Sequence, residues 1–401
     1  MPDPEPLIIA GSSVRAAAQS AVHAGFTPWC IDQFGDRDLA EISDDFRTVT
    51  DWPNEIASAI QSTPQAEWVY TGALENHRGL IENLSRQRSL CGCGNETLSK
   101  LRDPIWLADS LIKASLPSLP VIVPVSGIPE SGEWIVKPLA SAAGIGVHEL
   151  PGGSVGTVDF GGHYLQRKAR GRVISGLYLG VENSALLIGM CEQVCRGSDA
   201  GDLCYAYSGS FGPLAVADDS GDVFARAHRI GSAIAAGVRA EGVPLRGLFG
   251  IDFVLDDETG QLWTLEINPR YTASVEIYER AFGWPLMRWH VDACRGRNSK
   301  AAASLDSWTF DGGWPKHGKL IVYAEHDFAA PDIVPLVRRL SFNSHAESTV
   351  SVSDIPHVGT LIQKDEPVCT LLTARENLST CRKVLTAASC ELLTAIGEFA
   401  G

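Results

Sequence analysis

The chain has 401 residues, of which 45% are hydrophobic and 20% are charged, as in ordinary globular proteins. Its formal net charge is −15, which disfavours a general role in nucleic-acid binding because an acidic surface repels phosphate backbones. The length exceeds that of one ordinary hydrophobic core, so several domains are expected.

The first residues and the cysteines predict a cytoplasmic protein. The sequence MPDPEP lacks the basic and apolar segments of a signal peptide, and no apolar run approaches the roughly 20 residues that span a bilayer. The 10 cysteines are scattered and form no CxxC pair. We therefore expect reduced thiols, mostly in the core, with neither a disulfide framework nor a zinc site nor a membrane partner.

Residues 1–100 have the pattern of a doubly wound α/β domain. The apolar strand LIIAG (7–11) is followed by a helical segment and then by a second strand, TPWCID (27–32). A helix near 53–62 precedes a third strand, EWVYTGALE (67–75). This strand-helix-strand order predicts a parallel sheet, which binds its ligand at the carboxyl ends of the strands.

The loop after the first strand is a candidate substrate site. The segment LIIAGSSVRAA contains only Gly11 of a GxGxxG fingerprint, so it does not predict dinucleotide binding. It is either a plain strand-to-helix turn or an anion site at a helix N-terminus, aided by Arg15. The candidate substrate contacts at this edge of the sheet are Ser12, Ser13, Arg15 and Asp32.

Residues 101–305 are expected to form the largest domain. A helix at 101–118 and a linker of alternating Pro and Val lead into the strands EWIVKP, HYLQRKARG, RVISGLYLG and SALLIGMCEQV. These strands predict a small antiparallel lobe at about 120–210. The rest of the chain, 306–401, contains short strands and one closing helix, which predict a small β-rich domain.

Carboxylates interrupt two apolar strands in GLFGIDFVLDDETGQLWTLEINPR (247–270). The acidic turn DDETG predicts an antiparallel hairpin. Because side chains alternate along a strand, Glu266 and Asn268 share one face of the second strand, and Asp252 of the first strand can face Glu266. Two carboxylates and one amide are thus expected on one side of the sheet.

Facing carboxylates raise each other's pKa unless a positive charge lies between them. A hard divalent cation, Mg²⁺ or Mn²⁺, suits a set of oxygen ligands made of two carboxylates and one amide. The alternative is a solvated face of the sheet on which the acids are incidental.

Two further features favour a nucleotide site. Lys137 ends the apolar strand EWIVKP, although a lysine at such a position is often only a strand-end residue. The small residues of SAAGIG (141–146) allow close approach of a phosphate. Each feature is weak alone, and together with the acidic hairpin they indicate phosphate binding.

The order of these features resembles the ATP-grasp superfamily over roughly residues 1 to 300. The sequence is most similar to a group of predicted ATP-dependent carboligases related to biotin carboxylase. The resemblance implies an α/β ATP-grasp fold. Its parts are a pre-ATP-grasp domain (1–100), a two-lobed ATP-binding domain (101–305) with a mobile lid at about 120–210, and a small C-terminal domain (306–401).

The resemblance also implies ligand contacts. Gln166 would contact adenine by its side chain, and Lys168 and Ala169 by their main chain, while the 141–146 loop would close over the phosphates. The full set of nucleotide contacts is Lys137, Ser141, Ala142, Gly144, Gly146, Gln166, Lys168 and Ala169.

The same resemblance assigns the chemistry to the hairpin and the residues after it. Asp252, Glu266 and Asn268 would bind Mg²⁺ or Mn²⁺, and Arg270 would brace the transferred phosphate. Glu276 would orient Arg270 or act as a base, although a surface helix glutamate is the simpler interpretation.

The sequence departs from the superfamily pattern at three places. Val173 stands where relatives have a ribose-binding Glu, and Gly250 stands where many ligases have an Arg before the metal strand. The nucleotide-binding lysine expected near residue 100 is ambiguous between Lys100 and Arg102.

The implied function is an ATP- and Mg²⁺-dependent carboxylate–amine ligase that works through an acyl-phosphate. One setting for it is the biosynthesis of C1 cofactors of the tetrahydromethanopterin or methanofuran type. The alternatives are a carboxylase of the biotin-carboxylase or purine type that forms carboxyphosphate, and a nucleotide-binding protein without catalysis. Small-molecule carboxylate and amine substrates and, by analogy, a homodimer are expected.

Overall fold

The computed structural model describes residues 5–123, 132–150, 161–182, 184–216, 222–297, 301, 304–305, 308–343 and 350–400. Parts of the predicted Pro- and Val-rich linker and of the predicted lobe therefore lie outside the described residues. No helix among those described is long and apolar enough to cross a membrane.

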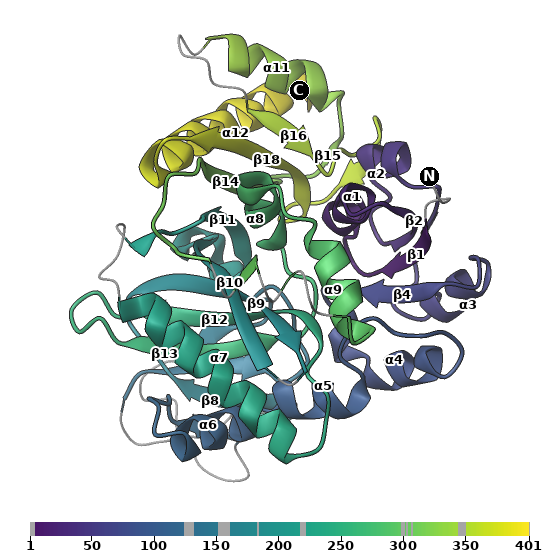
Figure 1. Cartoon of the computed structure of the whole chain (residues 1–401). Coiled ribbons are helices and arrows are strands. Elements are labelled where there is room, and N and C mark those ends of the chain that lie inside the picture. Colours follow the sequence, from purple (N-terminus) through teal and green to yellow (C-terminus); the bar gives the residue numbers. More distant parts are fainter. Residues whose placement is uncertain are drawn as a thin grey trace.

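The N-terminal unit is built on a four-stranded parallel sheet (Figure 1). Its strands run in the order β3 (Asp45–Thr48), β2 (Phe26–Asp32), β1 (Glu5–Ala10) and β4 (Glu67–Tyr70). Strand β1 is fully buried over its last four residues, as its apolar sequence dictates. The predicted parallel sheet is confirmed, and its strand order reverses beside β1, where ligands of such sheets usually bind.

Helices connect and flank these strands. Between the strands lie α1 (Arg15–His23), α2 (Arg37–Ile42) and α3 (Ile56–Gln61). After β4 come the short 3₁₀ helix η1 (Leu74–Asn76) and then α4 (Arg78–Ser85), α5 (Asn95–Leu101) and α6 (Pro104–Lys113). The start of α6 is fixed by Asp103, whose carboxylate accepts hydrogen bonds from the first backbone amides, with Pro104 at the first helical position.

A second, small antiparallel sheet contains the KP strand. It consists of β5 (Val121–Ile122), β8 (His163–Arg167), β6 (Trp134–Pro138) and β7 (His148–Glu149), in that order. Trp134, Val136 and Leu165 form its own hydrophobic cluster, separate from the larger cores. A sheet with a core of its own can move as a unit, which suits a cover over a ligand site.

The central sheet has eight strands and extends through two of the expected domains. Its order is β13 (Leu262–Asn268), β12 (Gly247–Leu255), β9 (Arg172–Val181), β10 (Ser184–Cys195), β11 (Tyr207–Gly212), β14 (Lys316–Tyr323), β18 (Pro367–Arg375) and β16 (Ser351–Ser353). Strand β11 pairs directly with β14, so the C-terminal strands continue the same sheet.

This topology refines one expectation. The predicted lobe at about 120–210 divides between two sheets, because only the strands up to Arg167 join the small sheet and the later ones join the central sheet. The C-terminal region has helices and a hydrophobic cluster of its own, and its strands β14, β18 and β16 continue the central sheet.

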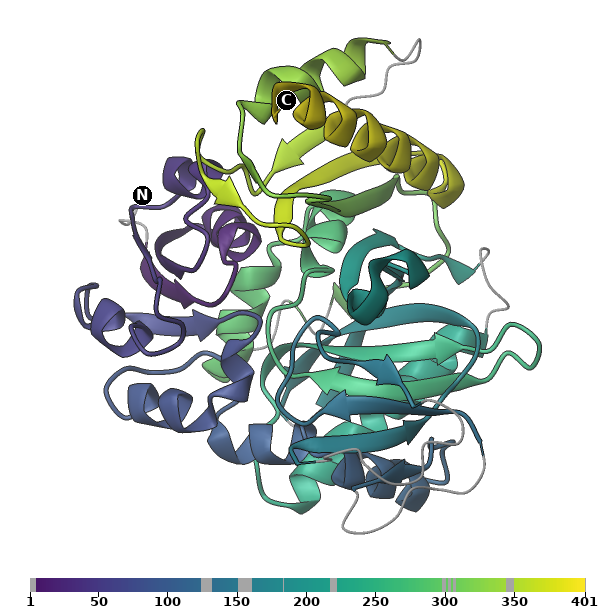
Figure 2. The ribbon, with the colours of Figure 1, turned by 180° about the vertical axis from the view of Figure 1, so that it is seen from behind.

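Helices cover the central sheet. Helix α7 (Asp222–Ala240) packs on β10 and β9, and α12 (Leu378–Ala400) packs on β14 and β18. Helix α9 (Leu286–Cys294) contacts α1 on one side and β9 and β12 on the other, so it joins the N-terminal unit to the central sheet (Figures 1 and 2). The remaining elements are η2 (Ser198–Leu203), α8 (Val275–Phe282), β15 (Phe328–Ala329), α11 (Ile333–Asn343) and β17 (Leu361–Ile362).

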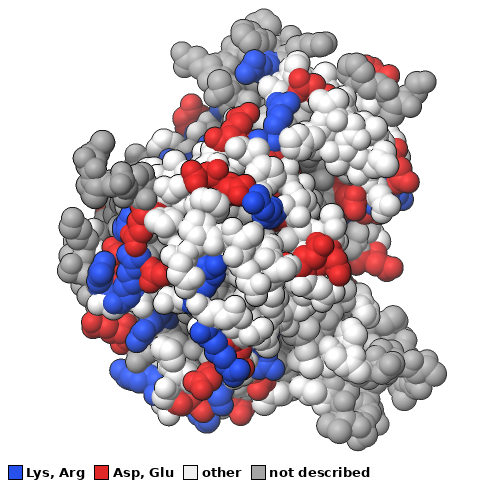
Figure 3. Space-filling view, turned by 90° about the vertical axis from the view of Figure 1, so that its right-hand side faces the viewer, with Lys and Arg blue, Asp and Glu red and all other residues white. Residues whose placement is uncertain are grey.

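Charges are mixed on the face that lies to the right in Figure 1. Acidic and basic side chains alternate there around a broad area that is neither (Figure 3). The acidic side chains seen on this face are therefore not gathered in one region of it.

Candidate active site

The predicted pairing of the hairpin carboxylates is confirmed. Strands β12 and β13 are antiparallel, and Asp252 lies directly opposite Glu266. The amide of Asn268 donates a hydrogen bond of 2.7 Å to Oδ2 of Asp252. Oδ1 of Asp252 accepts a second hydrogen bond, 2.9 Å long, from Gln193 on β10.

The two carboxylates have opposite pKa shifts. Burial, and then the facing charge of Glu266, raises the pKa of Asp252. Burial also acts to raise the pKa of Glu266, but the charges of Lys137 and Arg102 outweigh it and lower that pKa below its usual value. Asp252 accepts hydrogen bonds from two amides and faces the carboxylate of Glu266. Of the two carboxylates, Glu266 is the one with a cation in contact, Lys137.

Lys137 contacts Glu266, a contact that the sequence did not predict. Its Nζ lies 3.1 Å from Oε2 of Glu266 and 5.7 Å from the centre of the Tyr164 ring. Burial lowers the pKa of Lys137, but Glu266 more than compensates, so the net pKa is raised and the ammonium stays charged. A buried lysine held by one carboxylate is positioned to bind an anion that approaches the same face.

Arg270 is held by a carboxylate from the N-terminal unit. Its Nε donates a hydrogen bond of 2.6 Å to Oε1 of Glu75, whose side chain is fully buried. One Nη donates to Oδ1 of Asn268 at 3.3 Å. Arg270 therefore connects the hairpin to the segment after β4.

The backbone beside Glu75 is strained and closely packed. Ala73 has a φ of +74°, a left-handed conformation that a residue with a Cβ rarely adopts. A Cβ on the neighbouring Gly72 would lie 3.5 Å from Cζ of Arg270. Strain of this kind persists where the surrounding structure requires it, often at functional sites.

The Gly-rich loop is fixed against the start of β11. The backbone oxygen of Ala143 accepts a hydrogen bond of 2.9 Å from the amide of Tyr207. Gly144 has a φ of +74°, and a Cβ there would lie 2.1 Å from the backbone oxygen of Tyr205. A glycine is therefore required at this position by both the backbone conformation and the close approach.

A small cleft of about 30 Å³ lies between this loop, the KP strand and the hairpin. The predicted site residues among its walls are Lys137, Ser141, Ala142, Gly144 and Glu266. This volume is far below the roughly 300–1,000 Å³ of small-molecule sites. Entry of a nucleotide therefore requires the small sheet or its loop to shift.

The structure distinguishes between the two candidate cations near residue 100. Arg102 lines the cleft, and one Nη donates to the backbone oxygen of Ser141 at 2.7 Å. Lys100 is half-exposed and pairs with Glu241 at 3.1 Å. Arg102 is thus the cation of this segment that faces the cleft.

The predicted hinge residues are held by protein contacts. Gln166 is buried, and its amide donates to the backbone oxygen of Leu265 at 3.1 Å. The amide of Lys168 donates to the backbone oxygen of Glu133, and its ammonium lies 2.6 Å from Glu149. Ala169 follows directly after these contacts. Their predicted role toward adenine stays a prediction.

The candidate substrate residues of the first domain serve mainly to fix the loop after β1. The Asp32 carboxylate accepts hydrogen bonds from the amides of Val14, Phe34 and Gly35 at 2.6–2.8 Å. The Ser12 hydroxyl donates to the side chain of Gln33, and the backbone oxygen of Ser13 accepts from Thr71. The amide at this helix N-terminus is thus already bound by a carboxylate of the protein.

Arg15 and Glu276 meet each other in a buried cluster. Arg15 is 2% exposed and donates to Glu276 at 2.8 Å and to Asp354 at 2.8 Å. Glu276 also accepts from Lys319 at 2.8 Å and from Arg280 at 3.1 Å. Glu276 is therefore buried rather than a surface residue, and the carboxylate that contacts Arg270 is Glu75 instead.

Two residues of the site escaped prediction from sequence. Glu75 contacts Arg270, and Gln193 contacts Asp252. Glu75 had a usable signal, because it follows the end of β4 on the edge where parallel sheets bind their ligands. Gln193 had no such signal, because β10 was not expected to lie in the same sheet as the hairpin.

Two sequence comparisons match parts of the chain. Residues 111–274 match the family model of the ATP-grasp domain. A segment of 58 residues is 40% identical to the arginine-specific carbamoyl phosphate synthase large chain of Halalkalibacterium halodurans. That segment is 14% of this chain and only 5% of the curated relative, so the match concerns a small part of that protein.

Solved structures match nearly the whole chain. The biotin carboxylase domain of the Hydrogenobacter thermophilus 2-oxoglutarate carboxylase has a TM-score of 0.65 at 13% identity, covering 96% of this chain and 89% of that chain. The N5-carboxyaminoimidazole synthetase of Staphylococcus aureus has 0.64 at 15% identity, covering 96% and 97%. The L-amino acid ligase of Bacillus licheniformis has 0.66 at 11% identity, covering 98% of both chains.

At 11–15% identity, these structural matches establish the fold alone. With the domain match, they confirm the predicted fold class and the predicted superfamily. They support the predicted class of enzyme, an ATP-dependent ligase.

Proposed function

The chain contains an ATP-grasp domain, and from this premise we propose that it is an ATP- and Mg²⁺-dependent ligase that joins a carboxylate to an amine. The observation that carries the proposal is the hairpin face. There Asp252 and Glu266 oppose each other, Lys137 contacts Glu266, and Arg270 contacts Asn268. Cations and anions alternate on this face, as phosphoryl transfer requires.

In the proposal, Lys137 and Arg102 bind the phosphates of ATP beneath the Gly-rich loop. Both side chains line the small cleft, and both act on Glu266 electrostatically. Binding of ATP requires the small sheet to move away from the central sheet and then to close. Closure excludes water, so that the phosphoryl group reacts with the substrate and not with solvent.

The hairpin set fits a divalent cation. Among the residues that the structure describes, no group of three His, Cys, Asp or Glu side chains is arranged to bind a metal. The set here has two carboxylates, and its third ligand is the amide of Asn268. Burial, and then the facing charge of Glu266, raises the pKa of Asp252, and a cation placed between the two carboxylates would relieve that repulsion. Mg²⁺ bound there would neutralise charge on the phosphate oxygens.

The proposed reaction has two steps. An oxygen of the substrate carboxylate attacks the γ-phosphorus of ATP, the bond to the β-phosphate oxygen breaks, and ADP leaves. The product is an acyl-phosphate. The nitrogen of the amine then attacks the carbonyl carbon, loses a proton and expels inorganic phosphate, which leaves an amide.

Arg270 is the residue proposed to stabilise both steps. Its planar guanidinium can bind phosphoryl oxygens bidentately through nitrogens that Glu75 does not occupy. Glu75 binds Nε and so fixes the orientation of the fork. Glu75 is thus a positioning residue in this proposal.

The test is release of ADP and phosphate from Mg·ATP with pooled carboxylates and amines, with and without bicarbonate. The amines include glutamate, pterin-type and tyramine-type acceptors. A signal that needs both a carboxylate and an amine supports the ligase. Glu266→Gln is expected to lower that signal at least about 100-fold, since it removes a charge beside the phosphates. Glu258→Gln, in the exposed turn of the same hairpin, is the matched control.

Full activity of Glu266→Gln would contradict the proposal. ATP that raises the melting temperature without any turnover in the pool would instead favour a protein that binds nucleotide without catalysis.

A carboxylase is the second candidate, because enzymes of that class are among the solved structures that share this fold. One matched structure is an N5-carboxyaminoimidazole synthetase with ADP, and another is a biotin carboxylase domain with MgADP and bicarbonate. ADP release that needs bicarbonate and no amine would assign this chain to that class. A role in making tetrahydromethanopterin- or methanofuran-type cofactors rests on the sequence resemblance alone and stays a prediction.

A further inference from the structure

Two tyrosines, one just before β11 and one at its start, contact the small sheet and its Gly-rich loop across the nucleotide cleft. The hydroxyl of Tyr205 donates a hydrogen bond of 2.9 Å to Oε1 of Glu149, on β7 of the small sheet. The amide of Tyr207 donates to the backbone oxygen of Ala143, in the loop. The closed position of the small sheet is therefore fixed by the segment that leads into β11.

That segment is itself anchored to the central sheet. The backbone oxygen of Ala206 accepts a hydrogen bond of 3.0 Å from the amide of Arg196, which directly follows β10. The backbone oxygen of Tyr207 accepts one of 2.6 Å from the hydroxyl of Tyr323, on β14. Tyr205 thus extends from a fixed support, and the small sheet is the part that moves when their contact opens.

The hydrogen bond between Tyr205 and Glu149 is charge-assisted but open to water. Hydrogen bonds from Lys168 and then from Tyr205 lower the pKa of Glu149, so this carboxylate is ionised at neutral pH. Burial, and then the contact with Glu149, raises the pKa of Tyr205, so its hydroxyl keeps the proton that it donates. The side chain of Glu149 is 55% exposed, so water competes for it. A contact of this kind can break and form again during each catalytic cycle.

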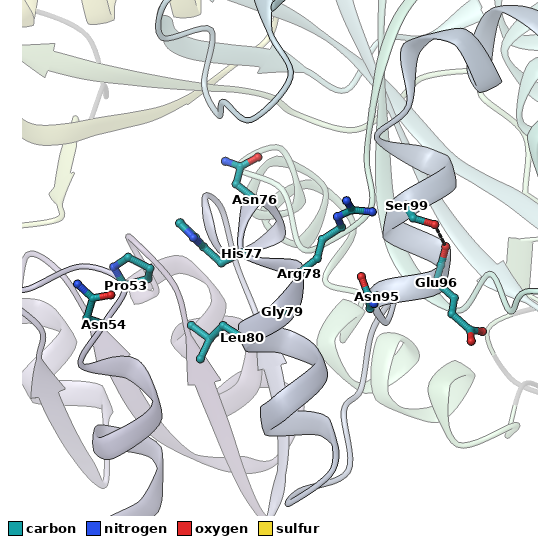
Figure 4. Close-up of a pocket in the computed structure, with 10 residues that line it drawn as sticks. All are labelled: Pro53, Asn54, Asn76, His77, Arg78, Gly79, Leu80, Asn95, Glu96 and Ser99. Atoms are coloured by element: carbon teal, nitrogen blue, oxygen red, sulfur yellow. Dashed lines mark hydrogen bonds between the residues drawn. The ribbon is translucent and has the colours of Figure 1, made fainter. Parts of the chain in front are cut away.

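Other contacts across the cleft use groups that the proposed function gives to the nucleotide. Lys137 pairs with Glu266 at 3.1 Å, and Arg102 donates to the backbone of the Gly-rich loop. Arg102 is also held by Asn76, which lines an open depression of about 820 Å³ beside α4 and α5 (Figure 4). ATP would compete for Lys137 and Arg102. The Tyr205 contact is independent of those cations and can persist with or without ATP.

From these contacts we propose that Tyr205 and Glu149 form a latch that holds the small sheet and its loop closed, and that ATP enters the cleft only while this latch is open. The inference rests on the proposed function and adds the two residues that set the rate of nucleotide entry. Both are positioning residues, because neither is assigned a contact with the phosphates.

The latch also has a consequence for water. While the small sheet is closed, water is kept from the phosphates. Without the latch, a water oxygen can attack the γ-phosphorus, the bond to the β-phosphate oxygen breaks, and ADP, inorganic phosphate and a proton are released. Loss of the latch is therefore expected to raise ATP hydrolysis in the absence of any acceptor.

Two single variants and their combination test the latch. Tyr205→Phe removes one hydroxyl and keeps both the ring and the pair of Lys168 and Glu149. Glu149→Gln removes the charge that the hydroxyl binds. The matched control is Glu133→Gln, because the side chain of Glu133 is 53% exposed and its partner at 2.7 Å, Arg170, also lies beside the small sheet.

The first measurement is amide hydrogen exchange of residues 139–149 in the full chain without ATP, followed by mass spectrometry. Tyr205→Phe and Glu149→Gln are expected to speed exchange there by about three- to tenfold, the effect of losing one hydrogen bond. Glu133→Gln should exchange like the wild type. The double variant should exchange no faster than the faster single variant, because both changes remove the same contact.

The second measurement is stopped-flow binding of a fluorescent, ribose-labelled ATP analogue. The association and dissociation rate constants of Tyr205→Phe are both expected to rise by about three- to tenfold, because the latch must open in either direction, while the Kd changes little. Hydrolysis of Mg·ATP without an acceptor should rise in the same variant. Glu133→Gln should leave all of these quantities unchanged.

The inference is overturned if exchange of residues 139–149 is the same in the wild type and both single variants, or if the two effects add in the double variant. The binding data separate it from the proposed function. Faster exchange in the variants of a chain that binds no nucleotide keeps the latch and removes the proposed function. Nucleotide binding at one rate in every variant keeps the proposed function and removes the latch.

Discussion

Two clusters of buried charge in this molecule differ in balance. Around Glu276, the anions Glu276 and Asp354 meet the cations Arg15 and Lys319 at 2.8 Å each. On the hairpin face, Glu266 has Lys137 at 3.1 Å, whereas Asp252 opposes Glu266 and receives hydrogen bonds from the amides of Gln193 and Asn268 and from Ser175. Among the described residues, each carboxylate of the first cluster contacts a cation, and in the second cluster Asp252 does not.

The pKa directions express the same difference. Burial acts to raise the pKa of Glu276, but Lys319 and Arg15 outweigh it and hold that pKa well below the usual value. Burial and Glu266 raise the pKa of Asp252 instead. The balanced cluster holds parts of the protein together, whereas in the proposed function the hairpin carboxylates receive their further cation with the substrate nucleotide. Burial of a carboxylate alone does not distinguish the two.

The largest expected effect is a loss of stability when the cluster around Glu276 loses its charge balance. Glu276→Gln leaves Arg15 and Lys319 without a shared counter-charge and is expected to cost about 3–5 kcal/mol of stability, as when one partner of a buried ion pair is removed. Urea unfolding followed by circular dichroism measures it. Glu266→Gln, by contrast, relieves Asp252 but takes from Lys137 its carboxylate partner, so it is expected to cost less stability than Glu276→Gln.

The contrast between the clusters fails if Glu276→Gln unfolds at the same urea concentration as the wild type. It also fails if Glu266→Gln is the less stable of the two variants. Glu258→Gln, which is exposed, sets the baseline for a change of charge alone.

The next largest effect is expected on kcat, through the pair of Glu75 and Arg270 that links the N-terminal unit to the hairpin. Glu75→Gln keeps the shape of the side chain but weakens its hold on Nε of Arg270. If Arg270 acts on the transferred phosphate, kcat should fall by about 10- to 100-fold, the range for groups that orient a functional side chain. The Kd for ATP should be nearly unchanged.

Steady-state ADP release and ATP titration measure the two quantities. A variant with normal kcat and weakened ATP binding would place Glu75 in nucleotide binding instead. Glu82→Gln, on the exposed side of α4, controls for the loss of a negative charge nearby.

The unbalanced cluster was predictable from sequence and the balanced one was not. The alternation of GIDFVL and LWTLEIN placed Asp252 and Glu266 opposite each other, because strand period and hairpin pairing are local properties. The contacts of Glu276 reach Arg15, 261 residues earlier, and Lys319, 43 residues later. Nothing local in ASVEIYERAFG indicates that Glu276 contacts two cations from other parts of the chain.

The same limit applies to the fold. The individual strands at 172–194 were predicted, but they join the central sheet and not the small sheet of the predicted lobe. A strand pattern tells which side chains share a face and does not tell which strand lies beside it. Arg270 was predicted from the NPR motif, whereas its partner Glu75, 195 residues earlier, depends on that unpredicted packing.

The smallest expected effect is a pH dependence of stability due to Asp36. This acid lies near the cluster around Glu276, and the charge of Asp354 acts on it. Asp36 is 8% exposed. Burial, and then the charge of Asp354, raises its pKa from 3.8 to about 8. Between these two values the folded state binds more protons than the unfolded state. The stability contribution of Asp36 is therefore present at low pH and is lost as the pH rises toward 8.

Asp36→Asn removes this titration. The stability of the wild type relative to Asp36→Asn should fall by up to about 1.4 kcal/mol between pH 6.5 and 7.5, which is the limit for one proton over one pH unit. Urea unfolding of both proteins at the two pH values measures the difference. A difference that is independent of pH would show that Asp36 is ionised throughout, with Arg15 as its effective partner, and the cluster around Glu276 would then extend to include it.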